Sequence, residues 1–280
     1  MSAREASGSA AGERRGQDGG VRLERRSDGV ASIVLDRPHR RNSLDRAAST
    51  AMLAALDEVA RDPAVRVVVL RGEGGVFCAG DDIHTAVGWL EGDDSDFPAD
   101  RATGDVYYSR ICEAVLALPR PVVAAVDGAA AGAGTEIACA ADLRVWSSRG
   151  RMGSCLIGVG HVGNAVMLAR VVGPARATEI YLTGRLVGAE EALRIGLADR
   201  VVPVERFDEE LDAVLAPLAA APTAAVGLFK ELRERARGVP AEHALRLQSA
   251  FHLRTYREVR DGTEGIRAFA ERRSPRFTGT

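Results

Sequence analysis

The chain has 280 residues and 46% of them are hydrophobic, which is enough to bury a substantial core in one large domain or in a core with an appendage. Its 37 basic and 39 acidic residues give a formal net charge of -2, so no general field attracts nucleic acid or an anionic membrane. No apolar run approaches the roughly 20 residues of a membrane-spanning helix, and the N-terminus lacks the apolar stretch of a secretory signal. We therefore expect no nucleic-acid partner, no membrane association and a cytoplasmic location.

Cysteine and histidine spacing indicates neither disulfides nor a metal site. The five histidines show no HExxH or comparable ligand spacing. The cysteines are far apart, form no CxxC pair and lie mostly among apolar residues, so we expect buried, reduced thiols. They are Cys78, Cys112, Cys139 and Cys155, and for Cys155 we expect only a small apolar filler.

The first third of the chain begins with a composition that predicts disorder, because residues 1–20 hold no bulky apolar side chain. Two short apolar runs, 21–26 and 30–35, flank Ser27-Asp28-Gly29 and predict a β-hairpin. Asn42 or Ser43 is expected to cap a helix that ends at Asp62-Pro63.

A buried strand at residues 65–70 is followed by a glycine-rich loop and by the segment 77–83, Phe-Cys-Ala-Gly-Asp-Asp-Ile. The acidic stretch 91–105 predicts a solvated, mobile loop that could cover a site as a lid. Residues 106–118 then show a helical period that ends before Pro119.

Residues 121–145 combine an apolar strand at 122–126, a turn rich in Gly and Ala, and a small-residue helix at 135–141. Gly128, Gly132 and Gly134 leave room for a close approach of backbone or ligand, so N–H groups at the helix start can face a ligand. Glu136 lies in the first helical turn. The same residues fit a second interpretation, in which the glycines only allow close packing and Glu136 only complements the helix dipole.

Both glycine-rich turns follow buried strands, so they are expected to converge on one site. Further along, we expect a strand at 143–146, an irregular segment at 152–162, three helices within 165–195 and a short strand at 201–204. The remainder is helical in period and suggests a docking or oligomerisation module. The predicted organisation is a disordered tail at 1–20, a core with the site at 21–204 and a C-terminal helical region at 205–280.

Taken together and in order, these segments resemble the crotonase superfamily, also called the enoyl-CoA hydratase/isomerase family. The resemblance covers residues 21–277, and although each matching word is common, the ordered set is specific. The words are Leu35-Asp36-Arg37-Pro38, Arg41-Asn42-Ser43-Leu44, residues 77–83, the strand at 122–126 with Gly128, Gly132, Gly134 and Glu136, Asp142-Leu143, Leu182-Thr183-Gly184 and Glu264-Gly265-Ile266-Arg267-Ala268-Phe269.

The resemblance implies an α/β fold, a crotonase-like spiral of ββα repeats with a C-terminal helical oligomerisation region, assembled as a homotrimer or homohexamer. It implies an acyl-CoA thioester as substrate, so that coenzyme A is part of the substrate and no metal or other cofactor is needed. Lys230 and the helices after it are expected to face a neighbouring subunit. The shared chemistry is a thioester enolate whose oxyanion is held by two backbone N–H groups.

Carried over position by position, these N–H groups belong to Asp81 and Ala133. The Asp81 side chain either points to solvent or tunes the acyl pocket. His84 stands where relatives often carry a cation that faces the coenzyme phosphates. The residues expected to bind the coenzyme are Ala79, Asp81, Ile83, His84, Gly132 and Gly134.

Glu136 matches the first catalytic glutamate of the hydratases, but the second acid is absent. Leu156 occupies its position in the hydratases, and Asn164 occupies the position of a carboxylate in certain isomerases. His161 is either a substitute acid/base or a structural residue. Hydration is most easily done by two carboxylates on one water, whereas one base is enough to move a double bond.

The leading prediction is therefore an enoyl-CoA hydratase/isomerase-like enzyme with Glu136 as acid/base. The alternatives are a hydrolase or decarboxylase on the same fold, or a CoA-binding protein with weak or no catalysis. A Rossmann dehydrogenase is disfavoured, because neither glycine turn reads GxGxxG between a strand and a helix.

Overall fold

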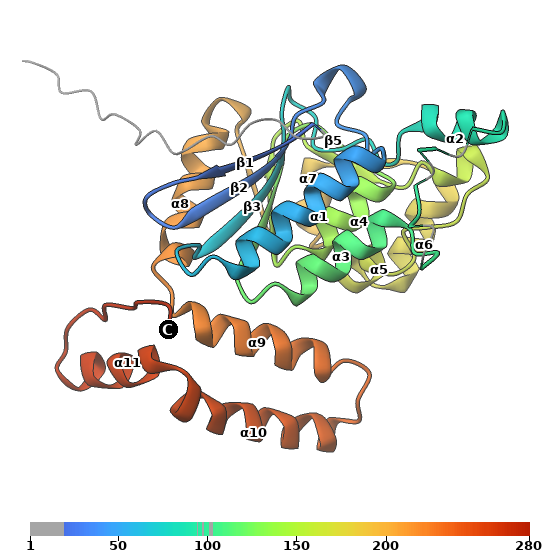
Figure 1. Ribbon diagram of the computed structural model, residues 1–280. Coiled ribbons are helices and arrows are strands. Elements are labelled where there is room, and N and C mark those ends of the chain that lie inside the picture. The colour runs from blue at the N-terminus through green and yellow to red at the C-terminus, as the bar shows by residue number, and fades with distance from the viewer. Residues whose placement is uncertain (1–19, 94, 97, 101–102) are drawn as a thin grey trace, which may run out of the picture.

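The computed structural model describes residues 20–93, 95–96, 98–100 and 103–280, so the expected tail lies almost wholly outside the described part. A six-stranded sheet, in the order β1-β2-β3-β4-β6-β9, forms the centre of the molecule (Figure 1). The β1–β2 pair is the predicted antiparallel hairpin, and the remaining neighbours are parallel. The strands are β1 (Val21–Arg25), β2 (Val30–Leu35), β3 (Val67–Gly72), β4 (Val122–Val126), β6 (Leu143–Ser147) and β9 (Arg200–Val202).

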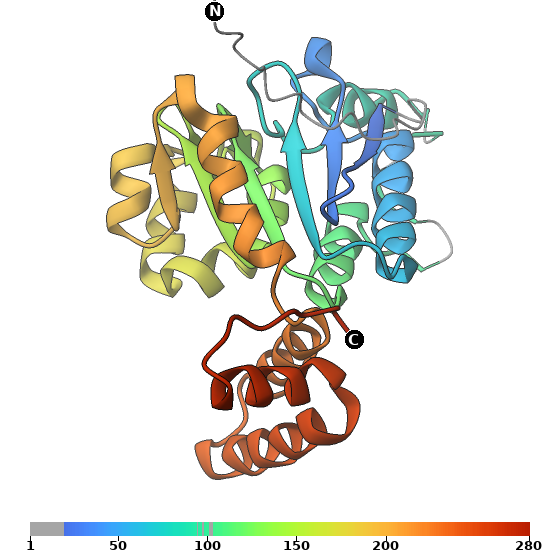
Figure 2. The same cartoon turned by 90° about the vertical axis from the view of Figure 1, so that its left-hand side faces the viewer.

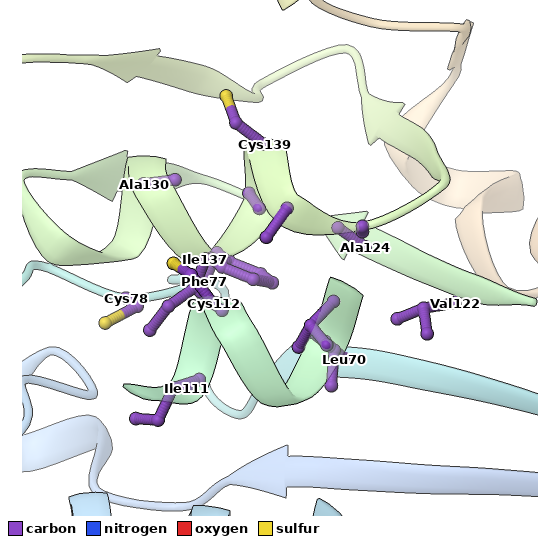
Figure 3. Close-up of a cluster of buried hydrophobic side chains, with 14 of the residues drawn as sticks. Leu70, Phe77, Cys78, Ile111, Cys112, Val122, Ala124, Ala130, Ile137 and Cys139 are labelled. Atoms are coloured by element: carbon purple, nitrogen blue, oxygen red, sulfur yellow. The ribbon is translucent and has the colours of Figure 1, made fainter. Parts of the chain in front are cut away.

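The central strands read as continuous apolar runs because helices cover both faces of the sheet. Successive side chains of a strand point to opposite faces, so Val68 and Leu70 of β3 join the larger core while Val67 and Val69 join the smaller one. Figure 3 shows part of the larger core, which packs strand residues against α1, α3 and α4. These helices are α1 (Arg46–Arg61), α3 (Tyr107–Ala117) and α4 (Ala133–Ala140).

Helix α1 begins later than the sequence predicted. Asp45 is its N-cap and accepts a hydrogen bond from the Ala48 N–H at 2.7 Å, so the expected cap at Asn42 or Ser43 is wrong. The physical reason is that Leu44 is extended and pairs with the loop at residues 80–82 before the helix can start.

A second, three-stranded sheet has the order β5-β7-β8. Its strands are β5 (Ala129–Ala131), β7 (Arg151–Gly153) and β8 (Leu186–Gly188). The sequence predicted only a turn where β5 lies. Helix α2 (Ile83–Leu90), capped by the Asp82 carboxylate, was not predicted either. The expected acidic lid lies partly outside the described residues and stays a prediction.

Most remaining helices lie where the sequence placed them. Helix α8 falls within the range 205–280, yet its apolar face packs on the central sheet, as Figure 2 shows in orange. Helices α9 to α11 extend from the core as a separate group (Figures 1 and 2). The bounds are α5 (Met167–Val172), α6 (Pro174–Thr183), α7 (Ala189–Arg194), α8 (Phe207–Ala219), α9 (Thr223–Arg235), α10 (Ala241–Glu258) and α11 (Arg260–Ala270).

Lys230 of α9 ties this group to the core. Its side chain is buried and pairs with Asp142 at 2.6 Å, and it also donates to the carbonyl of Arg120 at 2.9 Å. The expectation that Lys230 faces a neighbouring subunit is therefore wrong, because a buried ammonium needs its partners within the chain.

Of the helices that the structure describes, none alone has the length and apolar composition to cross a bilayer. One pair, Val204–Ala219 with Thr223–Arg235, passes that test only when joined across a bend of 94°.

Candidate active site

The two glycine-rich turns meet, as the sequence predicted. The Ala131 N–H donates to the Cys78 carbonyl at 2.9 Å, and the Phe77 N–H donates to the Ala129 carbonyl at 3.0 Å. Gly80 has a φ of 101°, and a Cβ there would lie 2.9 Å from the Ala131 oxygen and 3.3 Å from the Ala133 nitrogen. Only a residue without a side chain fits this contact comfortably.

Side chains from the segments 35–38 and 41–44, which carry part of the family resemblance, hold the 77–83 loop in place. The Asn42 amide donates to the carbonyls of Glu73 at 2.9 Å and Val76 at 2.7 Å, which fixes the turn before the loop. Arg37 pairs with Asp82, whose carboxylate also accepts from the Ser43 hydroxyl at 3.1 Å. These side chains therefore fix the conformation of the loop before any ligand binds.

Two backbone N–H groups are left available where the loops touch. Ala133 is the first residue of α4, and N–H groups of the first helical turn have no partner within their helix. Within the described part of the chain, no hydrogen bond uses the N–H of Ala133 or that of Asp81. Both groups are free to bind an acceptor from outside the chain.

A cavity of 460 Å³ lies against these groups. Seven predicted site residues line it: Ala79, Asp81, Ile83, His84, Gly132, Ala133 and His161. Residues that the sequence interpretation did not select line it as well, among them His39, Arg40 and Arg41. These three give the cavity a basic side suited to an anionic ligand.

Gly134 does not line the cavity, although the sequence placed it among the coenzyme-binding residues. A Cβ on Gly134 would lie 2.3 Å from the Cys78 carbonyl oxygen. Gly134 is therefore required for the close packing of α4 on the 77–80 loop, which is the second interpretation that the sequence allowed.

Glu136 also lies outside the cavity lining, one helical turn deeper, and is only 4% exposed. Its Oε2 accepts the Met167 N–H at 2.8 Å. Burial raises the pKa of Glu136, and hydrogen bonds from Met167, Asn164 and Val166 lower it by less, so the pKa stays above its usual value. Burial at this position therefore favours the protonated form of the Glu136 carboxyl more than in an exposed glutamate.

Of the two positions where relatives are expected to carry a second acid, Asn164 lies beside Glu136 and Leu156 lies at the cavity wall. The Asn164 amide donates to the Gly132 carbonyl at 2.8 Å and so supports the start of α4. Its Oδ1 is buried and has no partner among the described residues. Leu156 contributes an apolar side chain to the cavity wall.

Asp81 faces the cavity. Its side chain is reached by solvent from the cavity side while protein surrounds it elsewhere, and this loss of hydration raises the pKa to about 6. The charge of His161 opposes that rise, so the two residues interact across the cavity. The His161 carbonyl accepts from the Tyr181 hydroxyl at 2.9 Å, which holds the His161 backbone.

Three of the cysteines are buried as expected, whereas Cys155 is exposed and lines the cavity, so its expected role as a buried filler is wrong. It precedes a short 3-10 turn, Leu156–Val159, whose first and last residues also line the cavity. No group of three or more His, Cys, Asp or Glu side chains suited to a metal ion occurs in the described ranges.

The family model described as "Enoyl-CoA hydratase/isomerase" matches residues 25–280. The chain belongs to this family.

Relatives of this enoyl-CoA hydratase/isomerase family member include both reaction types. It is 31% identical over 256 residues to the 1,2-epoxyphenylacetyl-CoA isomerase of Escherichia coli, covering 90% of this chain and 95% of that protein. It is 32% identical over 254 residues to enoyl-CoA hydratase EchA19 of Mycobacterium tuberculosis, covering 88% and 91%.

A solved structure of an enoyl-CoA hydratase from Mycobacterium smegmatis matches with a TM-score of 0.81 at 31% identity, covering 92% of this chain and 98% of that one. The crotonase fold is thereby confirmed. The protein is an acyl-CoA-processing enzyme of the enoyl-CoA hydratase/isomerase type.

Proposed function

We propose that this enzyme moves the double bond of an enoyl-CoA thioester, with Glu136 as acid/base and the N–H groups of Asp81 and Ala133 as an oxyanion hole. The observation that carries the proposal is one buried carboxylate, Glu136, one turn behind a free helix-start N–H, with a leucine at the second acid's position. One base that removes a proton and leaves an enolate is sufficient for this reaction.

The thioester oxygen accepts from both N–H groups, while the coenzyme lies along the basic side formed by His39, Arg40 and Arg41. Removing the proton next to the carbonyl places negative charge on that oxygen. Each N–H is expected to contribute about 10²- to 10³-fold in rate, because it is fixed in place before the charge develops.

Glu136 accepts the substrate proton in its ionised form. Its raised pKa makes it a stronger base than an ordinary glutamate. Proton return to the far carbon then completes the shift of the double bond.

Hydration is the second candidate, and one observation favours it. Asp81, with a pKa of about 6, faces His161 in the same cavity as the free N–H groups. This pair could orient a water and move its protons where hydratases use a second glutamate. We rank it below isomerisation because solvent reaches both side chains through the cavity, whereas Glu136 is buried.

The test uses 3-enoyl-CoA and 2-enoyl-CoA thioesters of matched chain length, with mass analysis of every product. We expect the wild type to convert the first into the second, and Glu136→Gln to lower that turnover by about 100-fold or more. Unchanged turnover in Glu136→Gln would refute the assigned role.

The same reactions separate the other candidates. If the wild type adds water to the substrate and the variants Asp81→Asn and His161→Gln do not, hydration is supported. Release of free coenzyme A supports a hydrolase, and loss of carbon dioxide supports a decarboxylase. Calorimetric binding without any mass change supports a CoA-binding protein.

We also propose that the chain assembles as a homotrimer or homohexamer through its C-terminal helices. Large apolar side chains are exposed there and would be covered by a second copy. They are Phe229, Leu245, Leu253, Tyr256, Ile266 and Phe269. Light scattering on the purified chain measures the mass, and a monomer at micromolar concentration would contradict this.

A further inference from the structure

Tyr108, the second residue of α3, carries a half-buried phenol. Its hydroxyl oxygen lies 3.8 Å from the position that a Cβ on Gly163 would occupy. Leu156 Cδ1 lies 2.6 Å from that same position. The phenol is therefore a neighbour of the leucine that replaces the second acid.

The charged groups around this phenol come from both halves of the site. Glu136 of α4 and Asp81 of the 77–83 loop both act on it electrostatically, as does Cys112 from its own helix. Burial raises the pKa of Tyr108, a hydrogen bond with Ser109 lowers it by less, and the nearby Glu136, Asp81 and Cys112 raise it further. The phenol is thus protonated at neutral pH and can donate a proton but not accept one.

The Glu136 carboxylate is held in one orientation by donors from the chain. Its Oε2 is held by the Met167 N–H at 2.8 Å, and Asn164 and Val166 also donate to the carboxylate. A carboxylate fixed by several donors is a well-oriented base for one carbon, but it has little freedom to swing to a second. A proton donor on another element removes that constraint.

We propose that Tyr108 is the second catalytic residue and that it delivers the proton which completes the double-bond shift. This inference rests on the proposed isomerase function. Glu136 breaks the C–H bond next to the thioester carbonyl and becomes a carboxylic acid, while the electron pair moves into the enolate. The Tyr108 O–H bond breaks as its proton forms the new C–H bond at the far carbon. The resulting phenolate takes the proton from Glu136, which restores both groups and consumes no other reagent.

The decisive experiment compares two reactions of the full-length protein. The first is conversion of a 3-enoyl-CoA to a 2-enoyl-CoA. The second is exchange into D₂O of the proton next to the carbonyl of butyryl-CoA, a saturated thioester with no double bond to move. Exchange requires only the Glu136 step, whereas conversion requires both proton transfers.

In Tyr108→Phe we expect conversion to fall by about 100-fold or more, while exchange stays within about threefold of wild type. Glu136→Gln should lose both reactions. Tyr256→Phe, which removes an exposed phenol of α10, is the matched control and should retain both. The thermal midpoint of each variant and its calorimetric affinity for butyryl-CoA report whether the fold and the binding site are intact.

Replacing tyrosine with a fluorinated tyrosine of lower phenol pKa gives a second readout without truncating the side chain. The alkaline limb of kcat/KM should move to lower pH in the wild type and not in Tyr108→Phe.

Wild-type conversion by Tyr108→Phe would overturn the inference, and so would equal losses of conversion and exchange, because Tyr108 would then act only by positioning Glu136. Either of these results would leave the proposed isomerase function standing, because the wild type would still convert the substrate. A wild type that neither converts nor exchanges would instead overturn the proposed function, and this inference with it.

Discussion

The Cβ position of Gly80 lies 3.3 Å from the backbone nitrogen of Ala133, so the two loops that carry the free N–H groups touch each other directly. Because Gly80 also has a φ of 101°, any side chain there is strained and also pushes the loops apart.

Gly80→Ala should therefore lower turnover as well as stability. We expect a loss of about 1–3 kcal/mol in the free energy of unfolding, measured with urea, together with at least a tenfold lower kcat. Gly92→Ala is the matched control, because Gly92 has a φ of 89° but no atom within 4 Å of its Cβ position. If both variants lost kcat equally, contact between the loops would not be what sets the geometry.

Replacing Ala133 by proline removes one proposed oxyanion donor at a position where helices accept proline. We expect kcat/KM for the best enoyl-CoA to fall by about 10²- to 10³-fold. Ala189→Pro makes the same change at the first residue of α7, which also follows a glycine N-cap, and should retain activity. Calorimetric binding of free coenzyme A to Ala133→Pro checks that the binding surface survives, and full activity in this variant would exclude the Ala133 N–H as a donor.

Leu156→Glu restores a carboxyl group at the position that hydratases are expected to use. Glutamate is similar in volume to leucine, although it is longer and unbranched at Cγ, so it can occupy the same part of the cavity wall. We expect the rate of hydration of a 2-enoyl-CoA, measured as the loss of its absorbance, to be at least about tenfold higher than in the wild type. Leu156→Gln has the same shape without an acid and should not gain hydration; a gain there would mean that polarity alone is responsible.

Asp81 should make the stability of the protein depend on pH. The pKa of Asp81 is about 6 in the folded state and about 4 in the unfolded state. Its contribution to the free energy of unfolding is therefore fully present below pH 4 and is lost as pH rises through 6. From pH 4 to pH 7.5, the free energy of unfolding of Asp81→Asn should rise by about 1 kcal/mol relative to that of the wild type. This figure is reduced for solvent screening at the exposed side chain. Urea unfolding at both pH values measures it, with Glu190→Gln as an exposed control. An identical pH dependence in Asp81→Asn and wild type would contradict the raised pKa.

Much of the fold was predictable because burial on both faces makes β4 and the first four residues of β3 continuous apolar runs. Strand β5 was missed because Ala129–Ala131 has no β-branched residue, and only its pairing with Arg151–Gly153 makes it a strand. The start of α1 was misplaced because the pairing of Leu44 with a loop distant in sequence is a tertiary constraint.

The meeting of the two glycine-rich loops could be predicted from local sequence, since residues 79–84 and 132–136 each follow a buried strand closely. The cavity position of Arg40 depends on contacts between segments far apart in the chain, as does the approach of Tyr108 to Gly163. A spacing rule within one segment could not find either. Gly134 was assigned to ligand binding because sequence does not distinguish a glycine that meets a ligand from one that meets Cys78.

The proposed oxyanion donors are peptide groups held by glycine contacts, whereas the cavity wall is formed by replaceable side chains such as Ile83, Cys155 and Val159. Substrate preference and chemistry are therefore encoded in different atoms of neighbouring residues. A combinatorial library at Ile83, Cys155 and Val159 would explore new acyl groups without disturbing the donors. The same separation gives evolution a route by which one scaffold diverges towards many thioesters.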